Sequence, residues 1–82
     1  MNNLEQVLYD LVRPMVDHPE DLRVEETAGE DSRDAVLHVN ASQEDIARLI
    51  GRKGSMASAL RQVMGVASHR ENKRVTIVFE QQ

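Results

Sequence analysis

The chain has 82 residues, a net charge of −4 and no cysteine, so it has the size of one small domain and contains neither disulfides nor thiolate metal sites. The start, Met1-Asn2-Asn3 with an acid soon after, lacks the basic flank and apolar run of a signal peptide, and no apolar stretch approaches the roughly 20 residues of a transmembrane helix. We therefore expect a single domain over residues 1–82, located in the cytoplasm and away from membranes.

The charges are distributed unevenly along the chain. Residues 1–47 contain twelve acidic and three basic residues, for a net charge of −9, whereas residues 48–82 contain seven basic and two acidic residues, for +5. Because salt screens each charge beyond a Debye length of about 8 Å, a basic patch on an acidic protein can still attract phosphate. The asymmetry alone leaves open whether the second segment binds nucleic acid or is a solvated surface.

The first half of the chain predicts a helix followed by two strands. Apolar residues recur at helical spacing between residues 3 and 17, which indicates an amphipathic helix with a kink at Pro14, because proline removes one backbone donor. Residues 22–25 and 35–40 carry the alternation of half-buried strands. The small, polar residues 28–34 between them predict a loop.

The second half predicts two helices in close succession and a third strand. Ser42 can cap a helix that ends at Gly51, and the next helix starts near Gly54 and runs to about Ser68. Residues 75–79 form the strand. The order α-β-β-α-α-β predicts a two-layer α+β domain, in which three helices cover one face of a three-stranded sheet. The apolar stripe of the last helix comprises Met56, Leu60, Val63, Met64 and Ala67.

The two successive helices are joined only by Gly51-Arg52-Lys53-Gly54, which we call the GxxG loop. Each glycine can adopt positive φ and has no side chain to hold a ligand away. Gly54 also leaves the first amides of the next helix open to a phosphate, where the helix dipole favours negative charge. Arg52 and Lys53 add two cations, one of them capable of bidentate contacts. An ordinary helix-helix turn explains one glycine, whereas a backbone-phosphate clamp explains both glycines and the cations.

The sequence Ile50-Gly51-Arg52-Lys53-Gly54 resembles the Ile-Gly-x-x-Gly signature of KH domains, and the order of elements resembles their bacterial, type II arrangement. Essentially the whole chain, including residues 16–21 and 59–61, is similar to the small stand-alone bacterial KH proteins of the KhpA family. This resemblance implies binding of single-stranded RNA, with the loop contacting about four nucleotides of backbone, and a post-transcriptional or RNA-chaperone role. It also implies a homodimer or a heterodimer with a larger KH-containing protein, KhpB.

The resemblance implies the RNA contacts of the loop and of the apolar residues before it, and the positions of Arg48 and Arg61 beside the loop suggest two more. In KH domains the bases would lie in a groove between the two helices at the loop and the edge of the sheet. Residues 28–34 match the family's variable loop, which would form the opposite wall of this groove. Ala57 occupies a position where many KH domains have a large aliphatic residue, which predicts a shallow groove and low sequence selectivity. The candidate RNA-binding residues are Gly51, Arg52, Lys53 and Gly54 in the loop, Ile46 and Ile50 as an apolar floor, and Arg48 and Arg61 as flanking phosphate contacts.

No residue pattern indicates catalysis, a metal or a cofactor. His18, His38 and His69 are widely separated and lack the spacing of a metal site, and nothing orients a nucleophile beside a base. Tyr9 and Phe79 are the only aromatic residues, so the chain has no aromatic platform on which bases could stack.

Two other functions remain open from the sequence. A helix-turn-helix DNA binder would need a polar and basic recognition helix, and residues 54–68 offer only Arg61 and Gln62 beyond serines. A protein-interaction module with a vestigial RNA loop would dock a partner on the acidic first helix or on the half-exposed sheet.

Overall fold

The computed structural model describes residues 3–81. The two ends of the expected 1–82 domain, Met1-Asn2 and Gln82, lie outside the described residues, and so does most of the N-terminal Met1-Asn2-Asn3 sequence discussed above. The described residues form helix α1 (Leu4–Val12), strands β1 (Arg23–Ala28) and β2 (Asp34–Ala41), helices α2 (Gln43–Ile50) and α3 (Ser55–Arg70), and strand β3 (Arg74–Gln81). This order confirms the predicted α+β class.

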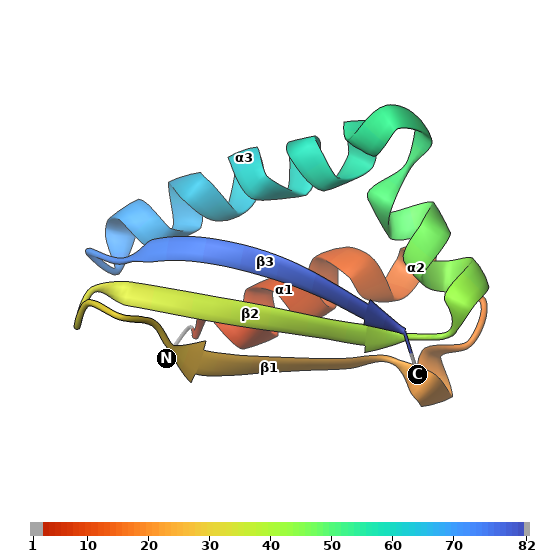
Figure 1. Cartoon of the computed structure of the whole chain (residues 1–82), viewed down its shortest axis with the longest axis horizontal. Coiled ribbons are helices and arrows are strands. Elements are labelled where there is room, and N and C mark those ends of the chain that lie inside the picture. Colours follow the sequence, from red (N-terminus) through yellow and green to blue (C-terminus); the bar gives the residue numbers. More distant parts are fainter. Residues whose placement is uncertain (1–2, 82) are drawn as a thin grey trace.

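The sheet has the strand order β1-β2-β3, with β2 in the centre. β2 pairs antiparallel with β1, where Val24 lies opposite Val39, and parallel with β3, where Leu37 lies opposite Ile77. All three helices lie on the same side of this sheet (Figure 1). The alternating side chains of β2 place Leu37 and Val39 in the core, where both are fully buried.

The first helix is shorter than the periodicity predicts. α1 ends at Val12, residues Arg13–Met15 tighten into a 3₁₀ turn, and Val16 is extended. The predicted single helix to residue 17 with a kink at Pro14 is therefore wrong. The proline ends the α-helix instead of bending it, because its ring clashes with the carbonyl one turn earlier and it has no amide to donate.

The strands are longer than predicted, and the loop between the first two is shorter. Ala28 closes β1 and Asp34 opens β2, so the turn contracts to residues 29–33, closed by a 3.1 Å bond from the Gly29 amide to the Asp34 carbonyl. β2 then runs for eight residues before the chain enters α2. The two ends of this strand therefore lie at opposite ends of the sheet (Figure 1).

Candidate nucleic-acid interface

The backbone of the GxxG loop is left-handed at three of its four residues. Gly51 has φ +78°, Lys53 +56° and Gly54 +77°. A Cβ atom at Gly51 would lie 2.8 Å from both the Cβ and the amide nitrogen of Met56, closer than carbon atoms approach without displacement, so this position accepts only glycine. A 3.1 Å hydrogen bond from the Gly54 amide to the Gly51 carbonyl closes the turn.

The loop opens directly into the N-terminus of a long helix. Gly54 is the N-cap of α3 and provides no capping side chain, and a Cβ atom built on it would meet nothing within 4 Å. The space in front of the first turn of α3 is therefore open, and the helix dipole makes this end attractive to anions.

The cations of the loop are not used in ion pairs within the described chain. Between residues 3 and 81, the basic residues of the second segment that form ion pairs are Arg48, Lys73 and Arg74, and all their acidic partners lie in the first segment, residues 1–47. Neither Arg52 nor Lys53 takes part in an ion pair in this range, and both side chains are exposed. Two of the cations that can meet a phosphate therefore lie side by side in the GxxG loop, and Arg61 and Arg70 of α3 are also exposed and outside these ion pairs.

The predicted apolar residues of α2 lie at different depths. Ile50, next to the loop, is 36% exposed, whereas Ile46 is 5% exposed and belongs to the core. A ligand at the loop can reach Ile50, while Ile46 supports the helix from below. Ala57 is also buried, at 3%, so its small side chain faces the core and not an open groove.

The two flanking arginines are placed differently. Arg61 is exposed on α3 and lies seven residues after Gly54, or about 10 Å along the helix. Arg48 is two residues before Ile50, which places the two side chains about 200° apart around α2. The structure therefore does not bring Arg48 to the side of α2 on which Ile50 is exposed.

The turn at residues 29–33 is not near the GxxG loop. It lies at the far end of β2, while the loop follows α2 at the other end of the sheet (Figure 1). The prediction that residues 28–34 form the opposite wall of a groove at the loop is therefore wrong. Asp31 of this turn and Asp34 at the start of β2 instead bind Arg74, at 3.3 and 2.9 Å.

α2 carries a buried carboxylate, Asp45, whose role the sequence did not reveal. Asp45 has no exposed surface, and its oxygens accept hydrogen bonds of 2.9 Å from the backbone amides of Asp17 and His18. These bonds, above all that from Asp17, hold the pKa of the Asp45 carboxyl below its usual range in spite of the opposing effect of burial. The only sequence signal was an acid three residues after Ser42, which also fits an ordinary helix cap.

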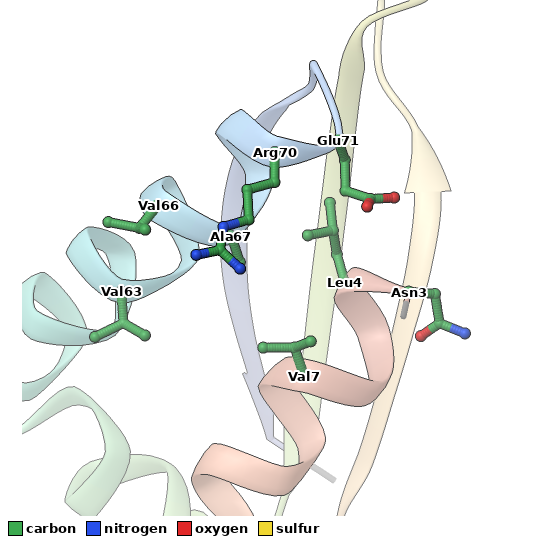
Figure 2. A pocket seen from close by; sticks show the side chains of 8 residues that line it. All are labelled: Asn3, Leu4, Val7, Val63, Val66, Ala67, Arg70 and Glu71. Atoms are coloured by element: carbon green, nitrogen blue, oxygen red, sulfur yellow. The ribbon is translucent and has the colours of Figure 1, made fainter. Parts of the chain in front are cut away.

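A second feature missed by sequence reasoning is an apolar groove between α1 and the C-terminal half of α3, with a volume of about 460 Å³. Figure 2 shows Val7 and Leu4 of α1 facing Val63 and Ala67 of α3 across it. Val63 is 48% and Val66 66% exposed, so the apolar stripe predicted for the last helix, which includes Val63, is only partly buried. The lining residues are Asn3, Leu4, Val7, Val63, Val66, Ala67, Arg70 and Glu71.

Comparison with known proteins assigns the chain to a family. The model of the KhpA/KhpB KH domain matches residues 5–79. The chain belongs to this family. Curated relatives named RNA-binding protein KhpA include those of Clostridium perfringens, 35% identical over 90% of this chain and 96% of the relative, and Leifsonia xyli subsp. xyli, 39% identical over 92% and 96%. That of Bacillus subtilis is 33% identical over 89% of this chain and 88% of its own length.

No solved structure gives a significant match to the chain. Within residues 3–81, no helix has the length and apolar character needed to cross a membrane. In the same range, no cluster of three or more histidine, cysteine or acidic residues is arranged to hold a metal ion.

Proposed function

We propose that this protein binds single-stranded RNA by gripping its sugar-phosphate backbone with the GxxG loop, with low sequence selectivity. The observation that carries this proposal is the loop itself: a left-handed backbone that only glycine permits at Gly51, with Arg52 and Lys53 exposed and outside the ion pairs of the described residues. Membership of the KhpA/KhpB KH family supports it, as do the relatives named RNA-binding proteins.

The chemistry of the loop suits a backbone better than a base. Its amides, helix terminus and two cations recognise negative charge, and such contacts position a strand without reading its sequence. Ile50 can contact one base or sugar by apolar packing, and Arg61 can reach a phosphate further along α3. With no stacking aromatic in the loop, binding by one domain is weak and sensitive to salt.

A direct test compares a fluorescent single-stranded RNA, the matching DNA strand and a DNA duplex as ligands of the protein. The informative variant combines Arg52→Asp with Lys53→Asp, and the control combines Arg13→Asp with Arg23→Asp, which changes the net charge equally on exposed residues of other elements. We expect the loop variant to lose RNA binding and the control to weaken it only slightly.

The outcomes separate the alternatives. If the loop variant stays folded and binds RNA as tightly as the control does, the clamp is wrong and the protein-interaction module is favoured. A strong preference for the DNA duplex in the unmodified protein favours the helix-turn-helix function instead.

The proposal extends to a cytoplasmic, post-transcriptional or RNA-chaperone role in which the protein acts as a homodimer or with a larger KH-containing partner such as KhpB. The exposed valines of the α1–α3 groove support pairing, because contiguous apolar surface often marks an interaction site. Sedimentation tests the homodimer: a monomer at high concentration in the absence of a partner excludes it. Where a dimer is found, we expect Val66→Asp to dissociate it.

A further inference from the structure

The GxxG loop depends on α2 for its position. α2 has only eight residues, and a helix of this length is not stable without tertiary contacts. Its last turn continues into the loop without a break, since the Gly51 amide donates to the Ala47 carbonyl at 2.9 Å. A rotation or shift of α2 therefore moves Gly51, the start of the loop.

The polar contacts that hold α2 converge on residues 15–18, which follow the end of α1. Asp45 accepts the amides of Asp17 and His18, each at 2.9 Å. One turn later, Arg48 donates to the Asp45 carboxylate at 2.9 Å and to that of Asp17 at 3.0 Å. Arg48 also lies 3.5 Å from the carbonyl of Met15. Two side chains of α2 thus fix it to a segment 27 or more residues earlier in the chain.

This network restricts α2 in a way that its apolar contacts cannot. Ile46 and Leu49 pack into the core, but packing is non-directional and tolerates small rotations. Hydrogen bonds to a buried carboxylate are directional, and a buried group that loses its partners is costly. The network also lies on the side of α2 away from the exposed Ile50, so it leaves the ligand side of the helix free.

We propose that Asp45 and Arg48 are positioning residues for RNA binding, which lock α2 onto residues 15–18 and so hold the amides and cations of the GxxG loop in the geometry that a phosphate backbone requires. This inference rests on the proposed function. It reassigns Arg48 from a phosphate contact to a support, because its guanidinium is already shared between Asp45 and Asp17.

The sign of one substitution tests this proposal. Asp45→Asn removes a negative charge near an RNA site, so electrostatics alone would tighten binding. Positioning predicts the reverse, a loss of affinity of about five- to tenfold, the lower range of couplings between sites. Glu44→Gln is the matched control: it removes the same charge from an exposed carboxylate of α2 that lies outside this network, and it leaves the Asp45 and Arg48 contacts in place. We expect its affinity to be unchanged or slightly higher. Both titrations are made where circular dichroism shows the variants fully folded.

A second pair of variants keeps the test decisive if Asp45→Asn does not fold. Removal of a phosphate contact reduces the slope of log K against log salt for a single strand by about 0.7. We expect Arg52→Gln to show this reduction, and Arg48→Gln to weaken binding with the slope unchanged. An equal reduction in slope for Arg48→Gln would make Arg48 a phosphate contact and overturn the proposal, as would equal affinities of Asp45→Asn and Glu44→Gln.

A measurement without RNA separates this inference from the proposed function. In NMR spectra of the free protein, the amide signals of Gly51 and Gly54 should shift in Asp45→Asn, or in Arg48→Gln, and stay in place in Glu44→Gln. If they shift as expected while Arg52→Gln has no effect on RNA binding, the positioning stands and the RNA function fails. If they do not shift, the positioning fails whatever the RNA result.

Discussion

Replacement of Lys53 by glycine separates the conformation of the GxxG loop from its charge. Lys53 has φ +56° and ψ +25°, a left-handed conformation that costs a residue with a side chain about 1–2 kcal/mol. Glycine removes this cost but loses about 0.5–1 kcal/mol through the greater freedom of its unfolded chain. The difference is roughly 0–1.5 kcal/mol in favour of glycine, so we expect Lys53→Gly to leave the free energy of unfolding unchanged or to raise it by up to about 1.5 kcal/mol.

The same variant should bind RNA less well, because it loses one cation at the tip of the loop while the backbone keeps its shape. We expect the salt slope to fall by about 0.7, the value for one phosphate contact on a single strand. Urea unfolding and RNA titrations at several salt concentrations measure the two effects. A loss of free energy of unfolding in Lys53→Gly would show that the Lys53 side chain supports the fold. An unchanged salt slope would show that this side chain does not contact phosphate.

Three further predictions concern the fold that supports the loop. Gly51→Ala should lower the free energy of unfolding by at least about 1–2 kcal/mol in urea titrations, since it adds a positive-φ penalty to a Cβ contact of 2.8 Å with Met56; an unchanged midpoint would mean that the loop relaxes freely. Met64→Ala should cost about 2–5 kcal/mol because Met64 is fully buried, and where the variant remains folded its salt slope for RNA should equal that of the unmodified protein. The lowered pKa of Asp45 implies a contribution to stability that is present above the unfolded-state pKa of about 3.9 and is lost as the pH falls through the folded-state value. The free energy of unfolding should therefore fall less steeply with decreasing pH in Asp45→Asn than in the unmodified protein. Parallel curves of this free energy against pH would contradict the assignment.

Local signals were sufficient to predict the order of elements and the loop. Ser42 caps α2 as expected, accepting the Asp45 amide at 3.3 Å, and the glycines at 51 and 54 both adopt the positive φ that their spacing suggested. These features depend on residues within a few positions of one another, which a single sequence displays directly.

The features that the sequence did not predict depend on contacts between distant residues. Nothing in the sequence near Arg48 indicates Asp17 as its partner, and a basic residue beside the loop is equally compatible with a phosphate contact. The position of residues 28–34 required the length of β2, and the exposure of Val63 required the packing of α1 against α3. Apolar periodicity locates a helix face but does not say how much of that face a neighbour covers.

The two surfaces to which we assign functions share a single helix. α3 has sixteen residues and therefore measures about 24 Å, with the GxxG loop at its N-terminus and the α1–α3 groove beside its C-terminal half (Figures 1 and 2). A partner seated in the groove would leave the loop uncovered, so occupancy of one surface need not exclude the other. The helix thus separates the two surfaces, and two domains joined through their grooves would each keep a GxxG loop available to RNA.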